Sequence, residues 1–218
     1  NTAAGPNSVT LADNDDGDYT ITSSTAITVN NGTAQVGDDV TLAGAGNKTV
    51  TGLAADLTLA DSNTGTTEVT SMAGNALSIT ADAAAGNLTV DAADLAEDTD
   101  LTLVGGANGK TATVNNLVGD VVASTLDSVL TVNLADADNN DISITTGTFT
   151  TSVLGSAADD TVSVIATAMA DDVLLTTAGA GEFTITDLKG NLSNTAAGPN
   201  SVTLADNDDG DYTITSST

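Results

Sequence analysis

A long internal repeat constrains this chain more than any other feature of its sequence. Residues 194–218 reproduce residues 1–25 letter for letter, at an offset of 193 positions. A match of 25 identical residues does not arise by chance, and internal repeats are typical of proteins built from stacked like units. We therefore predict that residues 1–193 form one full period of a tandem array and that residues 194–218 begin the next. Two alternatives remain, an artificially duplicated end and an isolated protein whose matching end segments swap between subunits.

A weaker repeat inside the period predicts the local structure. Residues 9–23 resemble residues 57–71 at a constant offset of 48, and both begin with an apolar–Thr–apolar triplet. Such alternation is typical of a half-buried β-strand, and the Asp, Asn and Gly between the triplets favour turns. Further triplets with Thr or Ser at the centre stand at residues 40–42, 77–79, 88–90, 101–103, 130–132, 142–144, 162–164 and 183–185.

The size of the apolar residues indicates how these strands pack. Aromatic residues make up 2% of the chain and Trp is absent, so the core must be thin and aliphatic. We predict an all-β parallel β-solenoid (β-helix) with two strands in each rung of about 20 residues, hence about 45 Å per period at ~4.8 Å per rung. The alternative is a series of tandem Ig-like β-sandwich domains, which have similar strand spacing. The Ala-rich stretches 81–85 and 92–96 are expected to form corners rather than helices.

The charge balance limits the partners of the chain. Thirty acidic residues face three basic ones, for a net charge of -27, and there is no His. Such a chain repels nucleic acid and anionic membranes and attracts cations. A hydrophobic content of 40% argues against a disordered acidic tail. Since no apolar run approaches the roughly 20 residues of a membrane span, we expect no membrane insertion.

Clustered aspartates are the candidate metal ligands. Calcium takes six to eight oxygen ligands, which crowded carboxylates in turns can supply. The alternative is that these residues serve only as solvated turn residues, and the EF-hand spacing is not met because Ala12 stands at its first position. The predicted calcium ligands are Asp13, Asp15, Asp16, Asp18, Asp136, Asp138, Asp141 and Asp160.

One short segment carries a resemblance to a known group of proteins. Residues 155–163, Gly-Ser-Ala-Ala-Asp-Asp-Thr-Val-Ser, resemble the calcium-binding nonapeptide of RTX-type β-rolls, with matches at Gly155, Asp160 and Val162. Ser156 and Ala158 stand where that pattern has glycine. The chain is in this respect similar to the Asp/Thr/Gly-rich repeat arrays of bacterial giant adhesins, surface layers and surface fibres. The resemblance implies an extracellular or cell-surface location and repeats rigidified by calcium.

Residue types missing from the chain argue against catalysis. Without His or Cys the chain lacks the commonest general base and the thiol nucleophile, and it has no Arg to hold an acidic substrate. Ranks of Thr-x-Thr triplets leave ice binding as a minor alternative. We expect a non-catalytic structural repeat of an extracellular filament, sheath, surface layer or stalk, with neighbouring identical repeats as its partners. The alternative is a spacer or ligand-binding region of a giant calcium-dependent adhesin.

Overall fold

The computed structural model describes residues 7–12, 17–31, 38–136, 141–158, 160–205 and 211–216. Within these ranges the chain forms 21 β-strands and no helix, so no helical segment there is long and apolar enough to cross a bilayer. The strands are β1 (Asn7–Thr10), β2 (Tyr19–Thr22), β3 (Ile27–Asn30), β4 (Val40–Ala43), β5 (Lys48–Thr51), β6 (Leu57–Leu59), β7 (Thr67–Val69), β8 (Leu77–Ala81), β9 (Leu88–Asp91), β10 (Asp100–Gly105), β11 (Thr111–Leu117), β12 (Asp120–Leu126), β13 (Val129–Leu134), β14 (Asp141–Thr145), β15 (Thr151–Gly155), β16 (Thr161–Ile165), β17 (Leu174–Gly179), β18 (Glu182–Leu188), β19 (Asn191–Asn194), β20 (Asn200–Leu204) and β21 (Ile214–Ser216).

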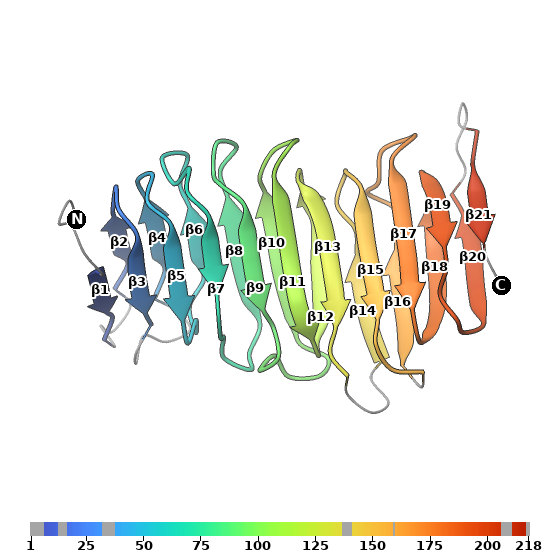
Figure 1. Cartoon of the computed structure of the whole chain (residues 1–218), viewed down its shortest axis with the longest axis horizontal. Coiled ribbons are helices and arrows are strands. Elements are labelled where there is room, and N and C mark those ends of the chain that lie inside the picture. The colour runs from blue at the N-terminus through green and yellow to red at the C-terminus, as the bar shows by residue number, and fades with distance from the viewer. Residues whose placement is uncertain are drawn as a thin grey trace.

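The strands alternate between two sheets along the chain. The odd-numbered strands form an 11-stranded sheet in sequence order, which we call sheet A, and the even-numbered strands form a 10-stranded sheet, sheet B. Every pairing between strands is parallel. The predicted parallel β-solenoid is confirmed, and the strands stack in one direction from β1 to β21 (Figure 1).

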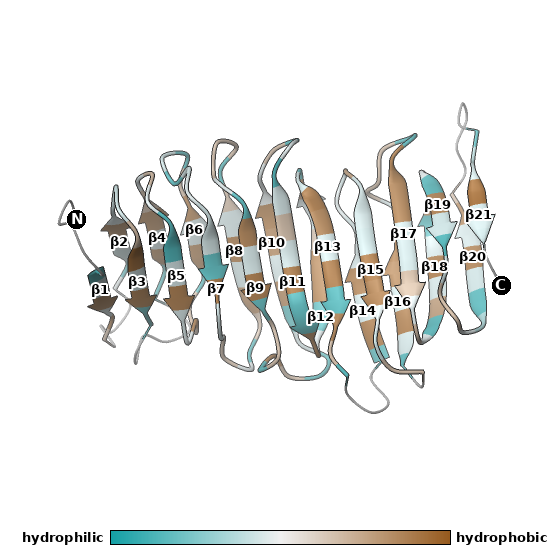
Figure 2. Ribbon diagram, viewed as in Figure 1, coloured by the Kyte–Doolittle hydropathy of each residue, from teal (hydrophilic) through white to brown (hydrophobic). Residues whose placement is uncertain are grey.

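Alternation of apolar and hydroxyl side chains places one face of each strand in the core. In β4, Val40 and Leu42 are fully buried, whereas Thr41 and Ala43 between and after them are half-buried on the outer side. Apolar and polar bands accordingly alternate along the strands (Figure 2). One apolar cluster runs through the stack from Leu11 to Ala196, so the solenoid has a single continuous core.

Glycine permits the closest approach of successive rungs at the corners. A Cβ atom on Gly46 would lie 1.9 Å from the carbonyl oxygen of Thr25, and one on Gly86 would lie 2.0 Å from that of Gly65. Neither position has room for a side chain, because backbone lies directly beneath it. The Ala-rich stretches 81–85 and 92–96 lie at the corners after β8 and β9, as predicted, with Ala81 as the last residue of β8.

Candidate functional site

The predicted calcium ligands are spread over several corners of the solenoid. Asp13, Asp15, Asp16 and Asp138 lie outside the described residues. Asp18, Asp136 and Asp141 are exposed, and Asp160 is buried with 1% of its surface accessible. In the part of the chain that the structure describes, no group of three or more acidic side chains has the geometry to hold a metal ion. Calcium binding therefore stays a prediction.

The segment that resembles the RTX nonapeptide closes one corner of the solenoid. Gly155 ends β15, and a Cβ atom there would lie 1.9 Å from the carbonyl oxygen of Ala180 on the next rung. The hydroxyl of Ser156 donates to the carbonyl oxygen of Ala135 on the preceding rung, and Val162 lies in the core. The described contacts of this segment thus join neighbouring rungs of the protein.

Corner Asp and Asn residues link one rung to the next. Asp56 Oδ1 accepts a hydrogen bond of 2.8 Å from the backbone amide of Ser78, and Asp120 Oδ1 accepts one of 2.7 Å from that of Ser143. Asparagine side-chain oxygens accept the same kind of bond from a backbone amide one rung on: Asn47 Oδ1 from Thr66, Asn87 Oδ1 from Thr111 and Asn191 Oδ1 from Thr213. These Asp and Asn residues therefore have a role in stacking, since they satisfy backbone amides at or near the start of a strand.

An acidic groove lies on the outer face of sheet B. Asp98, Asp120 and Asp141 line a shallow hollow of about 300 Å³ together with Ser143 and hydroxyl groups of β16. Asp100 lies opposite Asp120 in the register of β10 and β12. Burial raises the pKa of Asp120 above its ordinary value of 3.8, and the carboxylates of Asp100 and Asp98 act in the same direction, against the hydrogen bond from Ser143. The groove concentrates negative charge and favours protons or cations near it.

The spacing of three aspartates in the sequence is a signal for this groove. Asp98, Asp120 and Asp141 are spaced by 22 and 21 residues, which is about one rung each. Asp98 and Asp141 are far apart in the sequence, so closeness along the chain does not place them in one cluster. A spacing of about one rung between successive aspartates does.

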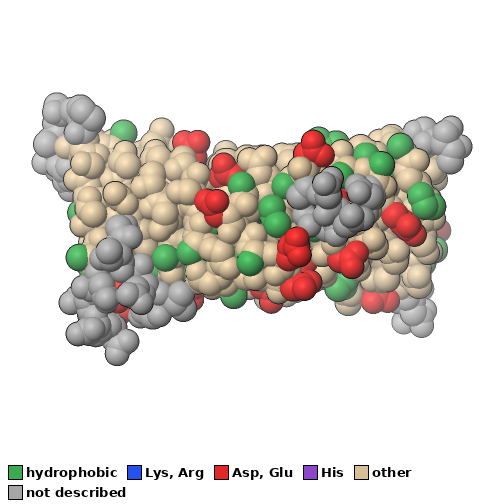
Figure 3. All heavy atoms as spheres, turned by 90° about the horizontal axis from the view of Figure 1, so that it is seen from below, with side chains coloured by type: hydrophobic (Ala, Val, Ile, Leu, Met, Phe, Trp, Pro, Cys, Tyr) green, Lys and Arg blue, Asp and Glu red, His purple; other side chains and the backbone are tan. Residues whose placement is uncertain are grey.

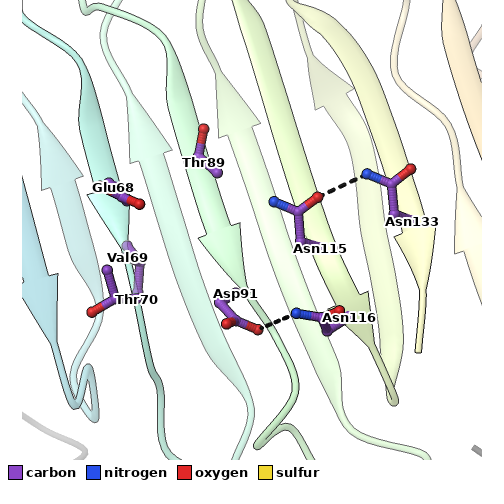
Figure 4. Close-up of a pocket in the computed structure, with 8 residues that line it drawn as sticks. All are labelled: Glu68, Val69, Thr70, Thr89, Asp91, Asn115, Asn116 and Asn133. Carbon is purple, nitrogen blue, oxygen red and sulfur yellow. Dashed lines mark hydrogen bonds between the residues drawn. The ribbon is translucent and has the colours of Figure 1, made fainter. Parts of the chain in front are cut away.

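A second groove lies on the outer face of sheet A and is shown in Figure 4. It has a volume of about 300 Å³ and is lined by residues of β7, β9, β11 and β13, or directly following them. Asn133 Nδ2 donates to Asn115 Oδ1 at 2.7 Å, and Asn116 Nδ2 donates to Asp91 Oδ1 at 3.0 Å. Amide, hydroxyl and carboxylate groups dominate this groove, so it can hydrogen-bond water or a polyol but offers no thiol or imidazole for catalysis.

A row of hydroxyl groups follows the outer face of sheet A. In the strand register one outward position per strand carries Ser or Thr in ten of eleven strands, and Glu68 is the exception. The row consists of Ser8, Thr28, Thr49, Glu68, Thr89, Thr113, Thr131, Ser152, Thr176, Ser193 and Thr215. Thr suits outward strand positions because its branched side chain packs well on a pleated surface.

Lys48 is a buried structural lysine that the sequence pattern did not predict. Its side chain occupies an inward position of β5 with 1% of its surface accessible, and burial lowers its pKa. The ammonium Nζ donates to the carbonyl oxygens of Gly44 at 2.8 Å and of Gly46, and to Asn63 Oδ1 at 3.1 Å. It is one of three lysines in the chain, and its ammonium group binds carbonyl and amide oxygens at a corner rather than a carboxylate. The available signal was that Lys48-Thr-Val50 repeats the apolar–Thr–apolar triplet with lysine at an apolar position.

Comparison of the chain with protein-family models, with curated proteins and with solved structures finds no match.

Proposed function

We propose that this chain is one period of a self-stacking, non-catalytic array that forms an extracellular filament, sheath, surface layer or stalk, as in the bacterial surface arrays that the sequence resembles. Its partner is then the neighbouring identical repeat along the axis. The observation that carries the proposal is a letter-for-letter repeat whose second copy continues the stack, since β20 pairs with β18 and β21 pairs with β19. Ile214 in β21 is 48% exposed, although its side chain is apolar and belongs to the repeated segment.

The direction of the hydrogen bonds supports a load-bearing role. Each strand pairs in parallel with the strand one rung away, so the bonds between rungs run along the axis of the stack. In such a solenoid each unit contacts only its neighbours, and stability grows with the number of units. Added periods would lengthen the core without changing its cross-section.

The charge of the surface supports association end to end rather than side to side. Acidic side chains are spread over the face of the molecule seen in Figure 3. The whole chain has only three lysines, and one of these, Lys48, is buried. Like charges on neighbouring fibres repel one another, whereas the ends of the stack present strand edges and apolar groups.

Small-angle X-ray scattering of a longer chain tests the proposal. The chain to compare with this one consists of residues 1–193 followed directly by residues 1–218. We expect the particle to lengthen by about 46 Å at ~4.8 Å per rung, with an unchanged cross-sectional radius. The control is the same chain with Val202→Asp and Leu204→Asp at the internal junction, which breaks the stacking there. A two-period chain that scatters as two bodies joined by a flexible hinge contradicts the proposal.

The second candidate function is a spacer or ligand-binding region of a giant calcium-dependent adhesin. The polar groove and the row of hydroxyl groups on sheet A favour it, because they offer an outward surface of hydrogen-bonding groups. Electron microscopy of the native material separates the two candidates. A regular filament or lattice supports the structural array, and a tether that ends in a distinct tip domain supports the adhesin.

A further inference from the structure

The two copies of the repeated segment lie in opposite sheets. Residues 7–10 form β1 of sheet A, whereas the identical residues 200–203 lie in β20 of sheet B. Residues 19–22 form β2 of sheet B, and their copies 214 and 215 lie in β21 of sheet A. β20 follows β1 after nineteen strand steps, and because a rung holds two strands the copies are nine and a half rungs apart.

The shorter internal repeat shows the same exchange of sheets. At an offset of 48 residues, the triplet that begins at Val9 lies in and after β1 of sheet A, and its match that begins at Leu57 forms β6 of sheet B. Ile21 in β2 of sheet B likewise matches Val69 in β7 of sheet A. These pairs are five strand steps apart, again an odd number. The two sheets therefore accept the same local sequence.

The uncovered end shows what would stack on it. In the first copy, Val9 pairs with Val29 of β3 and Ile21 pairs with Leu42 of β4. The backbone amide of Leu11 donates to the carbonyl oxygen of Asn30 at 2.9 Å. In the second copy, β20 and β21 are the last strands of their sheets. The strands that complement this end are therefore copies of β3 and β4.

We infer that the next copy of residues 26–43 covers this end, and that successive periods are related by a half-turn about the long axis with an advance of nine and a half rungs. This inference rests on the proposed array. The axial step is about 46 Å, and the same face returns only after about 91 Å, at ~4.8 Å per rung. The outer surface of sheet A and the acidic groove of sheet B then alternate along each side of the fibre. A partner that binds the outer face of one sheet would therefore find its site on both sides of the fibre. On each side of the fibre the site would recur every second period.

Labelling with gold clusters tests the half-turn. Because the chain contains no cysteine, Leu154→Cys places one thiol per period on the outer face of sheet A, where Leu154 is 47% exposed. In a chain of four periods, electron microscopy of particles labelled with maleimide gold should show successive clusters on opposite sides of the rod. Thr161→Cys marks the neighbouring strand β16 of sheet B and should give the same alternation. The double variant labels both faces in every period and so records any twist of the rod itself.

The outcomes separate this inference from the proposed array. Alternating clusters about 46 Å apart along the rod support the half-turn. Clusters on one side of a continuous rod, in both single variants, overturn the half-turn and leave the array standing. Particles that are strings of separate bodies overturn the array and the half-turn together.

Discussion

Leu11 and Leu204 occupy the same place in two identical segments, yet Leu11 is 4% exposed and Leu204 is 43% exposed. The difference comes from their neighbours, because β3 and the strands after it continue sheet A beyond β1, whereas no described strand lies beyond β20 in sheet B. Complete burial of a leucine side chain stabilises a protein by about 1.5–3 kcal/mol. The uncovered end therefore lacks a stabilising contribution that an additional rung would restore.

Truncation of these two leucines should have unequal effects. In this chain, Leu11→Ala should lower the free energy of unfolding by about 2–3 kcal/mol, because it leaves a cavity in the core. Leu204→Ala should lower it by less than about 1 kcal/mol, because the side chain is already half in solvent. In the two-period chain the same change at the internal junction should cost as much as Leu11→Ala. Urea denaturation measures all three, and an equal cost of Leu204→Ala in the short and long chains contradicts the account.

Replacement of Lys48 by methionine should destabilise the protein. The change removes the hydrogen bonds to Gly44, Gly46 and Asn63, and buried acceptors left without a donor cost about 1–3 kcal/mol each. Lys189→Met, at a partly exposed position, is the matched control and should stay within about 0.5 kcal/mol of the parent. Thermal melting of the two variants measures the difference, and a Lys48→Met protein as stable as the control would contradict this role.

The cost of losing Lys48 should depend on pH. Since burial lowers the pKa of Lys48 in the folded protein below 10.5, the unfolded chain binds more protons between the two values. The contribution of this group to stability therefore rises with pH in that window. We expect the gap in stability between the parent and Lys48→Met to widen as the pH is raised from the lowered pKa toward 10.5. A gap that narrows over this range would show that the charged form is the one that the fold favours.

Asp120→Asn should stabilise the protein at neutral pH. The amide can still accept the hydrogen bond from Ser143, while the repulsion by Asp100, directly opposite, is removed. Like charges opposite each other in a sheet cost roughly 0.2–1 kcal/mol, which sets the size of the expected gain. Asp127→Asn is the control for the loss of one negative charge, since Asp127 accepts from the hydroxyl of Thr148.

The gain from Asp120→Asn should disappear in acid. The pKa of Asp120 is raised above 3.8 in the folded protein, so the folded state binds more protons than the unfolded chain between 3.8 and the raised value. The contribution of this group is therefore favourable below 3.8 and is lost as the pH rises through the raised pKa. Denaturation at pH 7 and at about pH 3 compares the two conditions. A gain that persists unchanged at low pH would mean that charge repulsion is not its source.

Calcium should raise the melting temperature if the clustered aspartates bind it. Melting is compared in calcium and in a chelator at matched ionic strength, with magnesium as a control for general screening. Asn substitutions at Asp13, Asp15, Asp16 and Asp18 should reduce the shift. A midpoint that does not move between calcium and chelator removes calcium as a structural ligand.

The repeating triplets predicted the fold because they report burial directly. Val40-Thr-Leu42 has two inward aliphatic residues around an outward hydroxyl, and only strands present that alternation. The Asp and Gly between triplets predicted the corners for the same local reason. Local pattern does not say which sheet a strand joins, since both sheets show the same alternation. The exchange of sheets between Val9 and Val202 therefore emerges only when the strands are counted in the structure.

The grooves and the buried lysine depend on distances between rungs rather than on local pattern. Rung length varies: β4 to β6 advances 17 residues between Val40 and Leu57, whereas β12 to β14 advances 23 residues between Val121 and Ile144. A residue's neighbours on the next rung therefore follow from the register and are not evident from a fixed spacing. Lys48 was missed because a charged residue at an inward position is stable only when the corner turns several carbonyl oxygens toward it, which the pattern of residue types does not encode.

Hydrogen exchange at the uncovered end tests the central claim most directly. The chain is extended after residue 218 by a second copy of residues 26–43, and exchange of amides in residues 192–204 is followed by mass spectrometry. The control extension has the same composition with its alternation scrambled. If the next copy of β3 stacks on β20, amide exchange around Leu204 should slow at least tenfold with the true extension and should not slow with the scrambled one. The reason is that an amide hydrogen-bonded to the next rung exchanges only when that rung separates. Equal exchange in the two extended chains would contradict the claim that this protein continues by stacking its own repeat.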